Sequence, residues 1–229
     1  DVIRGFDNLS LAIDETYGWT QLMFSVHPDK VIREAAQGCE KSLSKFLNDV
    51  SLDRALYEAA GRVDGERLEG LAKRVHAHQM RDFRRSGVSK SEETRARLAK
   101  LHEEMVELGQ TFQKNVLADV RSVTITDAGR LEGLPQDFID AHAPDDDGTI
   151  TLTTNYPDFF PIQTYVQDSA LRKDLYEQFM QRAYPANGEV LLSLLKKRHE
   201  YATLLGYPSW AAYVTEDKMI GSAEATDAF

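Results

Sequence analysis

The stretch SEETRARLAKLHEEMVELGQTF, residues 91–112, decides the fold class of this chain. Its large apolar residues follow one another at alternating steps of three and four: Leu98, Leu101, Met105, Leu108 and Phe112. This spacing places them on one face of an α-helix, as a seam along which a second helix packs almost parallel. Ser89 and Glu92 have the Ser-x-x-Glu spacing of a capping box, which predicts that the helix begins there.

The predicted partner of this seam is the preceding helix, which runs from Glu66 to about Arg85 and ends at Gly87. Its apolar residues are Leu68, Leu71, Val75 and Phe83. The two segments would form a long helical hairpin over residues 66–119.

The rest of the chain also has mainly helical periodicity. Helices are predicted at residues 29–50, 52–60, 133–139, 170–183, 187–205 and from 208 onward, with Asn187 as an N-cap and Gly206 past the end of its helix. Residues 122–126 and 149–153 alternate and are rich in β-branched side chains, which predicts two short strands that pair. The predicted fold is mainly α, an elongated helical array with a long hairpin and one small antiparallel β-sheet.

The composition excludes several classes of partner. The chain of 229 residues has 37 acidic and 27 basic side chains and a formal charge of -10, which disfavours binding to nucleic acid or to an anionic membrane. Cys39 is the single cysteine, so an internal disulfide and a cysteine zinc ribbon are both excluded. A reducing compartment is expected, and we predict the cytoplasm.

The ends of the chain have no targeting pattern. The opening DVIRGFDNLS has no basic region followed by an apolar run, and no stretch approaches the roughly 18 apolar residues that span a bilayer. The chain starts at Asp1 rather than at methionine, so both ends are expected to be cuts in a longer protein.

Two short stretches come close to the zinc-peptidase pattern His-Glu-x-x-His. His199-Glu200 is followed by Thr203, and His102-Glu103 by Val106, where the pattern needs its second histidine. A catalytic zinc site needs three protein ligands, so ordinary helical roles are favoured. A weaker alternative pairs His76 or His78 with His102 across the hairpin. The sequence therefore predicts no catalytic, cofactor-binding or metal-binding residue in this chain.

Two charged clusters also suggest functions, and each has a simpler interpretation. Asp145-Asp146-Asp147-Gly148 lacks the alternate spacing of a calcium loop, and a solvated turn is favoured. The hairpin tip is basic, but acidic residues lie between its cations and no aromatic platform accompanies them, so a solvated face is favoured over an anion site. The basic residues are Arg74, Arg81, Arg84, Arg85, Lys90, Arg95, Arg97 and Lys100.

Five stretches, taken in order, resemble a known family. They are HPDKVIREAAQGCEKSLSKF (27–46), FQKNVLADV (112–120), GLPQDFI (133–139), LTTNYPDFFPIQTYVQDSALRKDLYEQFMQRA (152–183) and KKRHEYATLLGYPSWAAYVTEDKM (196–219). Their order and spacing are similar to the N-terminal half of the thimet oligopeptidase and neurolysin family of zinc metallopeptidases. The sharpest likeness is the Arg-x-Glu-x-Ala-x-Leu-Leu-Gly-Tyr run at residues 198–207.

The resemblance implies a parent enzyme that hydrolyses short peptides with a zinc-activated water. In that family the run at 198–207 lies on a structural helix, and the zinc motif comes well downstream, beyond Phe229. No family catalytic residue can be placed on this chain, which is therefore predicted to be inactive and to form one wall of the substrate channel. Its partners would be short peptides and the C-terminal catalytic part of the same protein.

The order of predicted helices and strands divides the chain into three regions. Residues 1–120 would be an N-terminal helical region with the hairpin, 121–154 a small β element, and 155–229 a helical region that continues into the catalytic part. The alternative is a stand-alone, non-catalytic helical module that binds peptides or proteins. The apolar residues after 187 cover more than one helix face, so the isolated fragment is expected to pair through its C-terminal third or to leave that third mobile.

Overall fold

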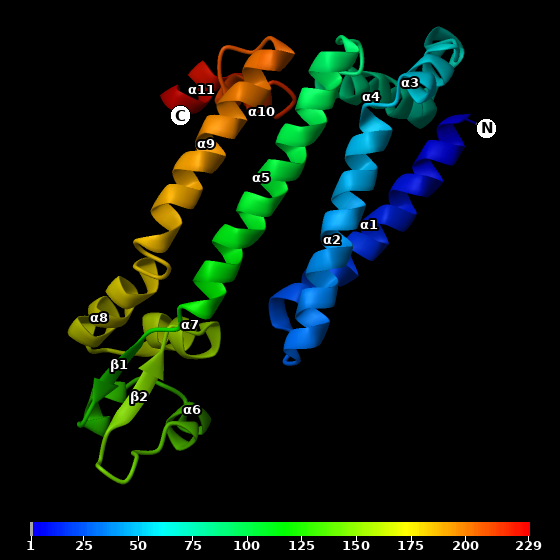
Figure 1. Ribbon diagram of the computed structural model, residues 1–229. Coiled ribbons are helices and arrows are strands. Elements are labelled where there is room, and N and C mark those ends of the chain that lie inside the picture. The colour runs from blue at the N-terminus through cyan, green and yellow to red at the C-terminus, as the bar shows by residue number, and fades with distance from the viewer. Residues whose placement is uncertain (1) are drawn as a thin grey trace. The chain divides into compact units, whose positions relative to one another are not determined.

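The computed structural model describes residues 2–229 and is mainly α-helical, with one two-stranded antiparallel sheet, as predicted (Figure 1). Asp1 lies outside the described residues. The helices are α1 (Val2–Val26), α2 (Lys30–Ser51), α3 (Arg54–Gly61), α4 (Gly70–Ser86), α5 (Glu92–Ala118), α6 (Gln136–Ala141), α7 (Tyr156–Tyr165), α8 (Ser169–Met180), α9 (Ala186–Leu205), α10 (Trp210–Thr215) and α11 (Ala223–Ala228). The strands are β1 (Ser122–Ile125) and β2 (Ile150–Thr153), and short 3-10 helices lie at Gly65–Arg67 and Ala128–Leu131.

The chain divides into two compact units. Unit 1 holds the chain up to Gln110 together with Leu192–Phe229, and unit 2 is Thr111–Leu191. The three-region division predicted at residues 120 and 154 follows changes in secondary structure, and it stays a prediction. Within residues 2–229, no helix is both long enough and apolar enough to cross a membrane.

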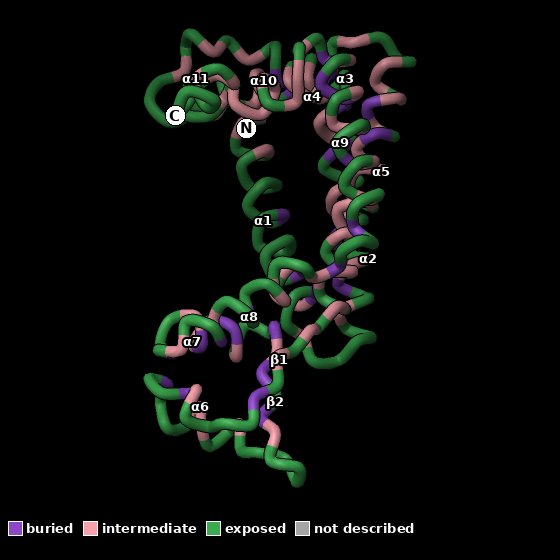
Figure 2. The backbone as a smooth tube through the Cα atoms, turned by 90° about the vertical axis from the view of Figure 1, so that its left-hand side faces the viewer, coloured by how far each residue is buried: buried purple, intermediate pink, exposed green. Residues whose placement is uncertain are grey.

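Helix α1 was not predicted from the sequence. It packs antiparallel to α2, and buries Ile13, Thr20 and Phe24 (Figure 1). Leu11 and Trp19 lie on α1 and are exposed, and most of this helix is exposed in Figure 2. Because its apolar residues lie on more than one face, α1 lacks the single stripe by which an amphipathic helix is recognised.

The partner predicted for the α5 seam was wrong. Leu98 and Leu101 are fully buried, and they pack against Tyr201 and Leu205 of α9 rather than against α4. Leu71 of α4 is 80% exposed, while Phe83 of α4 packs with Ala60, Val88 and aromatic side chains from α1 and α3. The periodicity of a seam fixes which face is buried, but it does not say which helix covers that face.

Two predicted helix starts were also wrong in detail. Helix α5 begins at Glu92, and the Ser91 hydroxyl, not that of Ser89, accepts from the Thr94 amide at 3.2 Å. Asn187 lies inside α9, where its side chain donates to the Phe112 carbonyl at 3.0 Å and accepts from Asn115 at 2.8 Å. The predicted helix ends are confirmed, since Gly87 and Gly206 follow α4 and α9 with φ of 91° and 101°.

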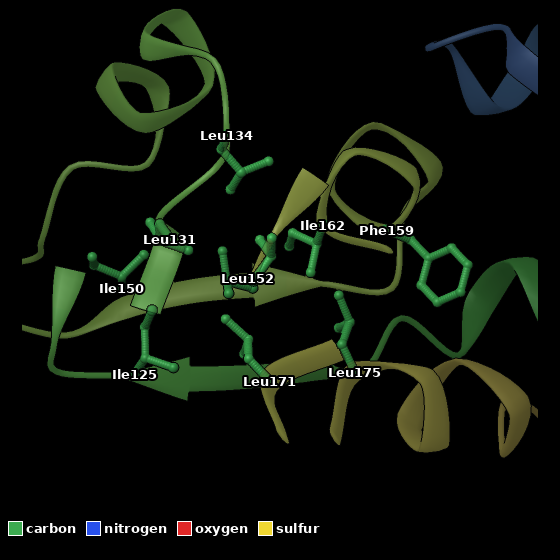
Figure 3. Close-up of a cluster of buried hydrophobic side chains, with 10 residues drawn as sticks. Ile125, Leu131, Leu134, Ile150, Leu152, Phe159, Ile162, Leu171 and Leu175 are labelled. Atoms are coloured by element: carbon green, nitrogen blue, oxygen red, sulfur yellow. The ribbon is translucent and has the colours of Figure 1, made fainter. Parts of the chain in front are cut away.

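Unit 2 is built around the β-hairpin. Val123 pairs with Leu152, and Ile125 with Ile150, as expected for strands that alternate buried and exposed side chains. Side chains from the 3-10 helix, α7 and α8 converge on the same buried face (Figure 3). The core consists of Ile125, Leu131, Leu134, Ile150, Leu152, Phe159, Ile162, Val166, Leu171 and Leu175.

Polar contacts fix the connections around this core. Asp158 of α7 accepts from the amide of Thr153 at 2.8 Å and from its hydroxyl at 2.5 Å, and also contacts the His142 ring at 3.1 Å. At the end of α7, the Gln167 amide donates to the Glu132 carbonyl at 3.0 Å, which brings Gly133 against the chain at Tyr165. These bonds tie β2, α7 and the loop before α6 together.

The acidic loop at 145–148 is an exposed turn, as predicted. The Gly148 amide donates to the Asp145 carbonyl at 2.8 Å. Asp147 accepts from the amide and the hydroxyl of Thr149. These are the contacts of a local turn.

Candidate functional site

The near-miss residues on α9 belong to the α5–α9 seam of unit 1. Glu200 forms an ion pair with Arg97 of α5 at 2.6 Å, and His199 is exposed. The hydroxyl of Thr203 donates to the carbonyl of His199 at 2.9 Å, so it serves the helix backbone. The glutamate of this near-miss motif is therefore used to join two helices.

A second ion pair lies along the same seam. Lys197 of α9 reaches Glu104 of α5 at 2.6 Å, and this hydrogen bond is the main reason that the pKa of Glu104 is lowered. Tyr201 packs beside Trp210 and Tyr213, and burial raises its pKa. The seam combines an apolar centre with charged pairs at its edges.

The suggested histidine cluster does not form. The Nε2 atom of His76 lies 3.0 Å from the Ala60 carbonyl, whereas Nε2 of His102 lies 3.0 Å from the Ser44 hydroxyl on α2. These two histidines face different helices, and His78 is exposed. Across residues 2–229, no group of three or more His, Cys, Asp or Glu side chains is placed to hold a metal ion.

Three residues of the basic cluster, Arg81, Arg85 and Arg97, form ion pairs within the chain. Arg85 has only 12% of its side chain exposed, forms ion pairs with Glu216 and Asp217, and lies 4.7 Å from the ring centroid of Tyr213. Arg81 pairs with Asp82 at 2.8 Å. A polar cavity of about 370 Å³ holds charges of both signs, and its charged lining residues are Arg81, Asp82, Arg85, Asp217 and Lys218. Paired charges of both signs do not make a site for a polyanion.

A polar seam joins α2 to α5 and is the most developed polar site of unit 1. We call it the α2–α5 seam, and it has ion pairs at Lys41–Glu107 and Lys45–Glu103 with the Ser44–His102 hydrogen bond between them. The side chains enclose a cavity of about 140 Å³. Burial lowers the pKa of His102.

The deeper end of this seam is held by a buried carboxylate. Glu40 accepts from Tyr17 at 3.2 Å, from Gln110 at 3.1 Å and from Gln21. The His102 ring bonds the Ser44 hydroxyl, and the nearby charge of Glu103 favours its protonated form. The polar contacts of this seam join α1, α2 and α5.

The burial of His102 predicts a pH dependence of stability. Because its pKa is lower in the folded chain than the ordinary value near 6.5, the unfolded chain binds a proton more readily, and stability is lost as the pH falls below about 6.5. When the pH is lowered from about 7.5 to about 5, the free energy of unfolding should therefore fall less in the His102→Gln variant than in the original chain. Urea titrations at both pH values measure this difference.

The matched control is His199→Gln, since His199 is exposed on α9. It should keep the pH dependence of the original chain. Equal pH dependence in His102→Gln and His199→Gln would show that His102 is not the group responsible.

Comparison with known proteins finds a family match for the C-terminal part of the chain. Residues 162–229 match the family model described as Peptidase family M3. The matched segment includes α8, α9 and the aromatic end of the α5–α9 seam. The predicted resemblance to the oligopeptidase family is confirmed.

Curated relatives extend the M3 similarity along most of the chain. Oligopeptidase A of Salmonella typhimurium is 29% identical over 214 residues, which cover 85% of this chain and 31% of that protein. Saccharolysin of Saccharomyces cerevisiae is 29% identical over 213 residues (87% and 30%), and the thimet-like oligopeptidase of Dictyostelium discoideum is 24% identical over 210 residues (88% and 31%). The chain spans about a third of the length of these M3 relatives.

Proposed function

We propose that this chain is the N-terminal, non-catalytic part of a zinc-dependent oligopeptidase that hydrolyses short peptides, and that it forms one wall of the substrate channel. The observation that carries the proposal is the M3 match at residues 162–229, together with relatives named oligopeptidases that are about three times as long. The downstream part of the same protein would supply the chemistry.

The described residues do not fit a catalytic zinc ion. His76, His102 and His142 each bond a protein oxygen, and although Asp158 contacts His142, no third ligand completes a zinc site among the described residues. The zinc ligands and the general base are therefore proposed to lie beyond Phe229. Short peptides and that downstream part are the proposed partners, and the cytoplasm the proposed compartment.

The direct test of this function is to read the encoding gene past Phe229. We expect His-Glu-x-x-His on a predicted helix downstream, because two histidines four residues apart can bind one zinc ion. A stop codon immediately after Phe229 would contradict the proposal. That outcome would favour the alternative, a stand-alone helical module that binds peptides or proteins.

The chain of 229 residues is expected neither to cleave peptides nor to retain zinc. Metal analysis after dialysis and a quenched-peptide assay would measure both properties, with the full-length protein as the positive control. One zinc retained per chain, and activity that chelation removes, would show that a site has been overlooked.

The outer face of α9 predicts self-association of the isolated chain. Leu194, Tyr201 and Leu205 are buried along one side of α9, while Leu192 and Leu195, which point away from that side, are exposed. We propose that the downstream part covers this face in the parent protein. Without it, a second copy should cover the face, because burial stabilises by about 25 cal/mol per Å² of apolar surface.

Light scattering over a range of concentrations measures this association. The double substitution Leu192→Gln with Leu195→Gln should weaken it at least about tenfold. Leu71→Gln is the control, since Leu71 is an exposed leucine on α4. A monomer at every concentration of the original chain would contradict the prediction.

A further inference from the structure

Unit 2 carries an exposed aromatic surface, which we call the aromatic shelf and define as Tyr156, Phe160 and Phe179. Tyr156 and Phe160 lie one turn apart on α7 and stack with their ring centroids 5.1 Å apart, although they are 57% and 55% exposed. Phe179 of α8 is half-buried against the unit 2 core and borders these two rings, with its centroid 5.9 Å from that of Tyr156. Large aromatic side chains that remain exposed next to one another are characteristic of binding surfaces.

The shelf is held rigidly from below. Phe159 stacks on Phe179 with centroids 3.8 Å apart, and it belongs to the buried core of unit 2 (Figure 3). Phe160 lies edge-on to Phe159 at 5.6 Å. The exposed rings therefore need little ordering when a ligand binds, which reduces the entropy cost of binding.

Arg182 lies over this shelf as a fixed cation. Its guanidinium carbon is 3.8 Å from the Phe179 ring centroid and 5.9 Å from that of Tyr156, and its Nε donates to the Phe179 carbonyl at 3.2 Å. Within residues 2–229, no carboxylate lies within ion-pair distance of Arg182. Its terminal nitrogens are thus available to an outside acceptor.

The nearby carboxylate of Asp119 does not act as the acceptor for the terminal nitrogens of Arg182. Asp119 is bound by Arg121 at 3.0 Å and by the Ala183 amide at 2.7 Å. Ala183 itself has φ of 60°, an unfavourable conformation for a residue with a Cβ atom, at the turn directly after Arg182. Strain of this kind is often kept where it positions a functional side chain.

We propose that the aromatic shelf and Arg182 bind the C-terminal residue of a short peptide whose last side chain is aromatic. The peptide's ring would pack against Tyr156 and Phe160, and its α-carboxylate would accept a forked pair of hydrogen bonds from Arg182. The net charge of -10 disfavours polyanions, and Arg182 interacts with Asp119 electrostatically without forming an ion pair, so a ligand with one carboxylate beside an apolar group fits this arginine best. The choice of a peptide as ligand rests on the proposed function.

The experiment is an NMR titration of the isotope-labelled 229-residue chain with N-acetyl-Gly-Phe as the free acid and as its C-terminal amide. The acid should bind at least about tenfold more tightly than the amide, because only the acid offers a charged acceptor. The Arg182 Nε–H signal and the Tyr156 and Phe160 ring signals should shift together. Equal binding of acid and amide, or shifts confined to other residues, would overturn the proposal.

Three variants separate the two parts of the site. Arg182→Gln should reduce the affinity for the acid to that for the amide, and Tyr156→Ala should weaken both ligands by a similar factor. Tyr165→Ala is the matched control, because Tyr165 is also on α7 and 54% exposed but makes none of the shelf's ring contacts. Unchanged core methyl signals would show that each variant is folded, and retained preference for the acid in Arg182→Gln would refute the role of Arg182.

This titration is independent of the test of the parent enzyme. It needs neither zinc nor the downstream part, so failure to bind leaves the oligopeptidase proposal intact. A gene without His-Glu-x-x-His would remove the oligopeptidase proposal, and the preference for acid over amide would still be measured directly.

Discussion

Gly133→Ala is expected to destabilise unit 2 by about 4 kcal/mol or more. Gly133 has φ of 103°, a conformation that residues with a Cβ atom rarely adopt. A Cβ at this position would also lie closer to the Tyr165 carbonyl oxygen than the 3.0 Å that real Cβ atoms keep. That oxygen belongs to the backbone at the end of α7. The hydrogen bond between Glu132 and Gln167 holds this segment against the segment that contains Gly133, so the oxygen cannot move away.

Gly148→Ala provides a matched control for Gly133→Ala. Gly148 has φ of 79°, but an added Cβ would meet no atom within 4 Å. It should therefore cost only the backbone penalty of about 1–2 kcal/mol. Urea unfolding and hydrogen exchange of the β1 and β2 amides would measure both variants. Equal losses at the two positions would mean that the chain at Tyr165 does not pack on Gly133.

Leu152→Ala is the second substitution with a large expected effect, a loss of about 3–5 kcal/mol. Leu152 has no exposed surface and lies at the centre of the unit 2 core, among side chains from α7 and α8 (Figure 3). Truncation removes buried methyl groups and leaves a cavity that strands and helices on several sides cannot close. The measurement is the urea midpoint together with the protection of the α7 and α8 amides.

Thr151→Ala tests the same strand on its opposite face. Thr151 is exposed and adjacent to Leu152 in β2, so its truncation should cost less than about 1 kcal/mol. A loss at Thr151 as large as that at Leu152 would show that the strand is turned over, since a shift of one residue exchanges the two faces.

The fold could be predicted where the pattern is local. The two strands were found because their β-branched alternation needs no knowledge of distant residues. The buried face of α5 was found for the same reason, through Leu98 and Leu101, but its partner α9 lies far along the chain and was missed. Helix α1 was missed because Leu11 and Trp19 leave apolar side chains facing outward.

The charged sites could be predicted less well, because they depend on pairing between distant helices. Lys41 and Lys45 are four residues apart on α2, and so are Glu103 and Glu107 on α5. Like charges at this spacing disfavour an isolated helix, which is a signal for an oppositely charged partner. That signal was present in the sequence, although it could not say which two helices would meet.

The position of Arg182 could not have been predicted at all. Its place over Phe179 depends on the turn at Ala183, an alanine with positive φ that no composition rule anticipates. The spacing of Tyr156 and Phe160 could have indicated a paired aromatic face on one helix.

The repeat of charges along the α2–α5 seam gives these two helices an alternative alignment. They run antiparallel, so a slide of one helical turn, about 5.4 Å, would break both ion pairs and bring Lys41 opposite Glu103, where one new pair can form. The interlocked leucines of the α5–α9 seam offer no comparable second position. Shear within unit 1 should thus be concentrated between α2 and α5, and dissolved salt, which screens exposed ion pairs, should make that sliding easier.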